Sequence, residues 1–195
     1  MQTPLVGASA PPASTRPDRR QPLVLAAAVG AALAIGLGVY GRLHTPTGDT
    51  IWTFGFPTLL AMKSWSTTIA IVLGLGQAAT AAWLFGRLPA VGPAPSGLAA
   101  AHRWAGTLAF LFTLPAAYHC LWALGFRDTD TRVLVHSILG CAFYGALATK
   151  LLVLRTDRLP GWALPAAGGI LVATLTGVWL TSSLWFFTNV GFPGW

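Results

Sequence analysis

The stretch that decides the fold is residues 101–155, which read AHRWAGTLAFLFTLPAAYHCLWALGFRDTDTRVLVHSILGCAFYGALATKLLVLR. Two long apolar runs are joined by the short charged segment RDTDTR at residues 127–132. His119 precedes this segment by about two helical turns, and His136 follows it by about one turn. If both runs are helices, the hairpin places the two imidazoles at a similar depth. The pattern therefore predicts a bis-histidine site near one end of a helical bundle.

The composition indicates a membrane protein. Hydrophobic residues make up 54% of the 195 residues and charged residues only 9%, whereas soluble domains carry about 25% charged residues. The net charge is +7, but the basic residues lie at the ends of apolar runs and form no binding face, which excludes nucleic acid as a partner. No phosphate-loop, zinc-protease or serine-hydrolase motif occurs, so these enzyme classes are excluded as well.

Five apolar segments predict an all-α fold, an integral membrane bundle of five transmembrane helices. The spans are expected at about residues 23–40, 65–85, 98–126, 133–154 and 162–187. Residues 1–21, rich in Pro, Ala, Ser and Thr and ending in arginines, are expected to form a disordered basic tail in the cytoplasm. The distribution of Lys and Arg favours an N-in, C-out orientation, which places His119 and His136 near the outer face.

Small residues beside both histidines suggest room for a flat macrocycle. They lie one helical turn from an imidazole: Ala116, Ala123 and Gly140. Imidazoles are common axial ligands of haem iron, and helix bundles often hold cofactors in their cores. We therefore expect one haem b, with His119 and His136 as its ligands. Neighbouring helices lie only about 8–10 Å apart, so the two helices have to splay, and Pro115 offers a kink that helps them do so.

The sequence is also compatible with other roles of the histidines. His44, on the same side of the bundle, completes a three-histidine copper or zinc site if it joins His119 and His136. His102, at the opposite end and off the His119 face, is a secondary candidate for a quinone or proton site. In a third alternative the histidines only hydrogen-bond between helices, and the protein is a structural or assembly subunit.

The phrases HRWAGTLAF (102–110) and YHCLWALGF (118–126) resemble an uncharacterised family of small bacterial multi-pass membrane proteins. The histidine hairpin also resembles the ferric-reductase-like and ascorbate-dependent transmembrane b-type cytochromes. Those cytochromes hold two haems on two histidine pairs, and here the resemblance covers one pair, His119 and His136. It implies an electron-transfer protein of the bacterial cytoplasmic membrane, accessory to a larger redox complex or a soluble electron-transfer protein, with quinone as a further partner.

Overall fold

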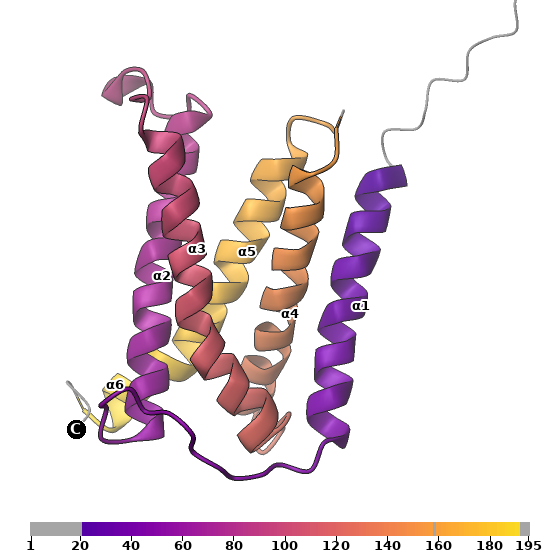
Figure 1. Cartoon of the computed structure of the whole chain (residues 1–195), viewed down its shortest axis with the longest axis vertical. Coiled ribbons are helices and arrows are strands. Elements are labelled where there is room, and N and C mark those ends of the chain that lie inside the picture. The colour runs from indigo at the N-terminus through magenta and orange to yellow at the C-terminus, as the bar shows by residue number, and fades with distance from the viewer. Residues whose placement is uncertain (1–20, 158, 192–195) are drawn as a thin grey trace, which may run out of the picture.

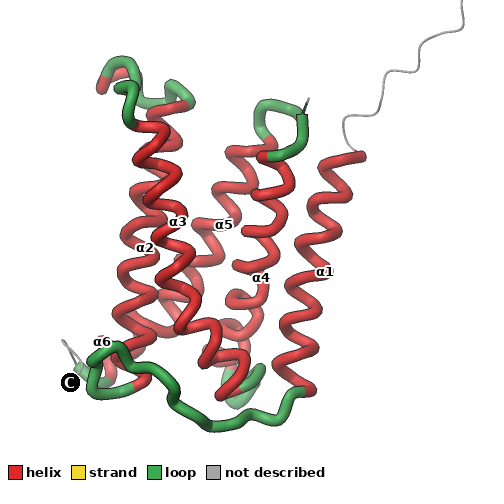
Figure 2. The backbone as a smooth tube through the Cα atoms, in the orientation of Figure 1, coloured by secondary structure: helices red, strands yellow, loops and turns green. Residues whose placement is uncertain are grey.

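The chain folds into long helices joined by short connections (Figure 1). The computed structural model describes residues 21–157 and 159–191, and that part of the chain contains helices and loops but no strand (Figure 2). The predicted tail lies outside it except for Gln21. The long helices are α1 (Gln21–Leu43), α2 (Leu59–Leu84), α3 (Leu98–Tyr118), α4 (Thr131–Leu154) and α5 (Ala163–Trp179).

Three shorter elements complete the helical part. A 3-10 turn, η1 (Pro89–Val91), lies in the connection between α2 and α3. The π-helical turn η2 (His119–Leu124) extends α3. A second π-helical turn, η3 (Leu180–Leu184), joins α5 to the short helix α6 (Trp185–Asn189). Both π-helical turns interrupt segments that the apolar pattern predicted as continuous helices.

Five helical segments of the described residues are long and apolar enough to cross a membrane, which confirms the predicted number and the all-α class. Their bounds are Gln21–Leu43, Leu59–Leu84, Leu98–Leu124, Thr131–Leu154 and Ala163–Asn189. Large apolar side chains face outward along them. Val24 and Leu25 are each 65% exposed and Ile35 is 66% exposed, a pattern that matches helices whose outer surface meets lipid rather than water.

The helices form an open arrangement in which consecutive helices are not always neighbours. α4 packs between α1 and α5, and α2 packs against α3 and α5. α3 and α4 do not pack closely against each other, although only a short turn joins them. In Figure 1 the turn between α3 and α4 lies at the lower end, with the α1–α2 connection. We call this the α3–α4 end and the opposite end the α2–α3 end.

The contact between α1 and α4 depends on small residues. The Thr149 hydroxyl lies 3.0 Å from the Gly145 carbonyl oxygen on its own helix and 3.3 Å from the Ala26 carbonyl oxygen on α1. A Cβ atom at Gly30 would overlap Thr149 and the Gly145 carbonyl oxygen. Backbones can approach this closely only where side chains are absent or small.

The observed α2 begins earlier than its predicted start at residue 65. Thr58 is its N-cap, and the Thr58 Oγ1 accepts a hydrogen bond from the Ala61 N–H at 3.0 Å. This capping satisfies a backbone donor that the first turn leaves unpaired. Lys63, which was expected in a loop, therefore lies inside the helix. The Lys63 ammonium therefore lies against the interior of the helical bundle.

Candidate functional site

A cavity of about 260 Å³ lies where α3 and α4 diverge, with α2, α5 and η3 forming its other walls. Most of its surface is apolar. The residues Ala116 and Ala117 on α3 and Gly140 on α4 have small or no side chains where they line it. Side chains with polar or charged groups line it toward the α3–α4 end: Lys63, Cys120, Arg127, Arg132, His136, Ser137, Thr181 and Ser182. The cavity therefore has an apolar body and a basic head.

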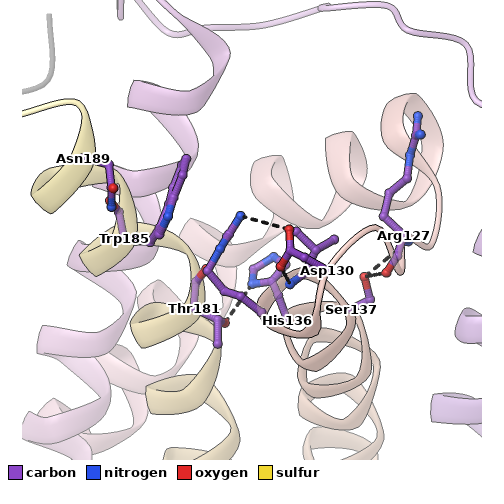
Figure 3. A network of polar contacts seen from close by, with 9 residues as sticks. Arg127, Asp130, His136, Ser137, Thr181, Trp185 and Asn189 are labelled. Atoms are coloured by element: carbon purple, nitrogen blue, oxygen red, sulfur yellow. Dashed lines mark hydrogen bonds and ion pairs between the residues drawn. The ribbon is translucent and has the colours of Figure 1, made fainter.

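His136 lines the cavity from the second turn of α4, and a contact to Thr181 fixes the orientation of its ring. Its Nδ1 lies 3.1 Å from the Thr181 Oγ1, as the dashed line in Figure 3 shows. The Thr181 hydroxyl donates its own hydrogen to the Gly177 carbonyl oxygen at 2.7 Å. With the hydroxyl hydrogen committed to Gly177, we assign Nδ1 as the donor, which puts the His136 lone pair on Nε2. The Cys120 thiol also interacts with this imidazole.

His119 is held in the same tautomer. Its Nδ1 lies 2.8 Å from the Pro115 carbonyl oxygen, which can only accept. The ring is completely buried, and the Nε2 has no hydrogen-bond partner within the described residues. Leaving a buried polar atom unsatisfied costs about 1–3 kcal/mol. The lone pair on this nitrogen is therefore a feature that packing alone does not explain.

The structure separates the two predicted ligands in one respect. His136 lines the cavity, whereas His119 does not, and its chain neighbour Cys120 takes a place in the wall. The reason is helical spacing: Cys120 follows Ala116 at i+4 and Ala117 at i+3 and shares their cavity-lining face, whereas His119 lies off that face. Ala123 also lies off this face: it is buried but does not line the cavity, whereas the other two predicted small residues do.

Arg132 is fixed at the head of the cavity by three contacts. One guanidinium nitrogen donates to the Thr181 carbonyl oxygen at 2.8 Å, and the guanidinium carbon lies 4.2 Å from the Trp185 ring centre. Its other terminal nitrogen lies 4.0 Å from an Asp130 carboxylate oxygen. Asp130 also caps α4 by accepting from the Val133 N–H at 2.9 Å. Figure 3 shows this network around His136.

Lys63 and Cys120 are site residues that the sequence interpretation missed. The Cys120 thiol lies within interaction range of the Lys63 ammonium and of the His136 imidazole. A signal for Lys63 was present, because Thr58 followed by LLAMK is a helix start with its N-cap. Cys120 carried no comparable signal, since an isolated apolar cysteine reads as a packing residue.

The remaining histidines are held by other neighbours. The His44 ring stacks on Tyr40 and on Trp122, with centroid distances of 5.1 and 4.5 Å. At the α2–α3 end, the His102 Nδ1 lies 2.8 Å from the Thr80 Oγ1. Across residues 21–157 and 159–191, no three His, Cys, Asp or Glu side chains gather as metal ligands. The three-histidine alternative is therefore not assembled there.

The fold and the cavity define an all-α bundle with five helices of membrane-spanning length and a histidine in the wall of an internal cavity. The chain belongs to the DUF6529 family, a family of unknown function whose model matches residues 23–194. The matched range contains every histidine of the chain. No curated protein and no solved structure matches the chain.

Proposed function

We propose that this chain is a membrane electron-transfer protein that holds one b-type haem between α3 and α4, with the Nε2 atoms of His136 and His119 as axial ligands. One observation supports the proposal most directly: both imidazoles have a hydrogen-bond partner at Nδ1, an arrangement that leaves Nε2 as the nitrogen for a ligand. Histidines that ligate metals are commonly fixed in this way by a second hydrogen bond. The haem, when bound, would supply the one-electron chemistry.

The walls of the cavity suit such a group. The divergence of α3 and α4 supplies the splay that a macrocycle needs. The volume of about 260 Å³ is slightly below the range of about 300–1,000 Å³ for ligand pockets. A neighbouring apolar groove shares Leu37, Ala117, Leu121 and Tyr144 with the cavity walls. Ligation by His119 also requires η2 to rotate, so that this ring replaces Cys120 in the wall.

We propose that the five helices span the cytoplasmic membrane of a bacterium with the N-terminus inside. The described basic residues are shared between the two ends, and Arg16, Arg19 and Arg20 in the preceding segment tip the balance. The head of the cavity then lies near the outer face. The electron partner is a larger redox complex or a soluble electron-transfer protein, and quinone in the bilayer is a further partner.

The test is the absorption spectrum of the protein purified after growth with ample haem. We expect a reducible Soret band in the wild type and its loss in His119→Ala and His136→Ala. His44→Ala and His102→Ala are matched controls, because both rings are anchored elsewhere, and these variants should keep the band. A folded but colourless wild type would contradict the proposal and favour a structural or assembly subunit.

A further inference from the structure

The basic head of the cavity lacks enough negative charge to balance it. We propose that Lys63 and Arg132 form a carboxylate-binding site for an amphiphile whose apolar body fills the cavity. Two sources supply that chemistry: the propionates of a haem, or the head of a fatty acid from the bilayer. The inference rests on the proposed function only for the first source, and the experiment separates the two.

Lys63 is the first basis for the site. It lies in the second turn of α2, is half-buried and lines the cavity. The two ion pairs found across residues 21–157 and 159–191 join Arg42 to Asp128 and Arg132 to Asp130, so no carboxylate there neutralises Lys63. A cation held among apolar helices is unfavourable without an anionic partner. The Lys63 ammonium also interacts with the Cys120 thiol, and an anion in the cavity would compete with that thiol for it.

Arg132 is the second basis. A guanidinium carries five N–H donors in a planar fork that matches a carboxylate. The bonds from Arg132 to the Thr181 carbonyl oxygen and the Asp130 carboxylate leave other donors available. Asp130 is only a partial counter-charge, because it lies at 4.0 Å and also accepts the Val133 N–H. The guanidinium is thus oriented in advance for a ligand.

The shape of the cavity selects an amphiphile over a small soluble anion. Beyond the basic head the walls are made by apolar residues such as Leu121, Leu175 and Val178. A neighbouring groove with almost no polar surface, lined by Leu33 and Leu114, shares residues with these walls. A ligand that uses the whole site therefore needs a charged end and a long or flat apolar body.

The experiment measures binding to delipidated protein in a non-ionic detergent with two matched pairs of probes. Each pair contains an acid and a neutral analogue: haemin with its dimethyl ester, and oleic acid with oleyl alcohol. For at least one pair, the wild type should bind the acid about tenfold or more tightly than the neutral analogue, because charge-assisted hydrogen bonds are lost in the latter. Lys63→Gln and Arg132→Gln should each reduce acid binding about tenfold and leave the neutral analogue unaffected.

Two further variants separate a specific carboxylate site from a general effect of charge. Lys63→Arg preserves the charge and should keep the preference for the acid, provided that it elutes as a folded, monodisperse species. Arg42→Gln is the matched control, because Arg42 is 59% exposed, pairs with Asp128 at 3.1 Å and does not line the cavity. If Arg42→Gln weakens acid binding as much as Lys63→Gln does, the effect is general electrostatics and the site is refuted.

The outcomes distinguish this inference from the haem proposal. Equal binding of acid and neutral analogue in both pairs overturns the carboxylate site, even if both forms of haem bind. Absence of haem binding, together with Lys63-dependent selection of oleic acid over oleyl alcohol, overturns the haem proposal and supports the carboxylate site. Selection of haemin over its ester, lost in Lys63→Gln and Arg132→Gln, supports both.

Discussion

The His136 Nδ1 lies 3.1 Å from the Thr181 Oγ1, and the Thr181 hydroxyl donates a hydrogen bond to the Gly177 carbonyl oxygen. This pair connects α4 to the π-helical turn η3 across one wall of the cavity. It also fixes which imidazole nitrogen faces away from the cavity and which remains available to a ligand. The position of one hydroxyl thus fixes the orientation of the histidine that lines this cavity.

Replacement of Thr181 tests this relationship. Thr181→Val removes the acceptor for the Nδ1 proton, so the imidazole loses its fixed tautomer and orientation. We expect haem affinity to fall about 10-fold or more, as is typical when an outer partner of a metal ligand is lost. Thr181→Ser should retain most of the affinity. Thr176→Val is the control, since Thr176 bonds only to the Val172 carbonyl oxygen and lies off the cavity; an equal loss in this variant would refute the assignment.

The contact between α1 and α4 predicts a difference between two glycines of the same helix. Gly30→Ala should destabilise the protein by about 1–3 kcal/mol, because a methyl group there would overlap Thr149. Gly36→Ala should be neutral or slightly stabilising, because a Cβ atom at that position meets nothing within 4 Å. Thermal unfolding in detergent measures both. Equal melting temperatures for the two variants would contradict the described packing.

Asp130 has two roles that substitution can separate. Asp130→Ala should lower stability by about 1 kcal/mol, because α4 loses the side chain that caps it. Asp130→Asn keeps a capping oxygen and removes only the charge beside Arg132, so its stability should stay close to that of the wild type. Thermal unfolding again provides the measurement. If Asn destabilises as much as Ala, the charge rather than the cap stabilises the start of the helix.

Cysteine labelling reports on occupancy of the cavity. Cys120 and Cys141 are both free thiols that line it. In a Cys120→Ser background, a small membrane-permeant maleimide should modify Cys141 slowly in the empty protein. Bound haem should block the modification, and mass spectrometry of the intact chain measures the difference. Equal labelling with and without haem would place the haem elsewhere.

The number and type of the helices could be predicted from the sequence because apolar length is a strong signal. Each span is an apolar run bounded by Arg, Lys, Pro or Gly, and these residues end helices or lie outside lipid. The start of α2 was wrong because aromatic residues 52–56 and Pro57 resemble a loop, while the Thr58 cap went unrecognised. An N-cap is a single side-chain contact, which hydropathy averages do not detect.

The site was only partly predictable for a physical reason. Gly140, Ala116 and His136 could be found by helical spacing, and all three line the cavity. The π-helical turn η2 could not, because an i→i+5 turn leaves the apolar pattern almost unchanged while it redirects the side chains. Cys120 rather than His119 lies in the wall because Cys120 shares the helical face of Ala116 and Ala117. Lys63 was missed for a different reason, since its helix was predicted to begin too late.

We propose that two imidazoles hold one haem between α3 and α4. Electron paramagnetic resonance of the ferric protein tests it most directly, because the signal depends on the axial ligands. We predict a low-spin signal of two imidazoles that is unchanged in Cys120→Ser and lost in both His119→Ala and His136→Ala. A signal that changes in Cys120→Ser but persists in His119→Ala, or protein that takes up no haem, would contradict the account.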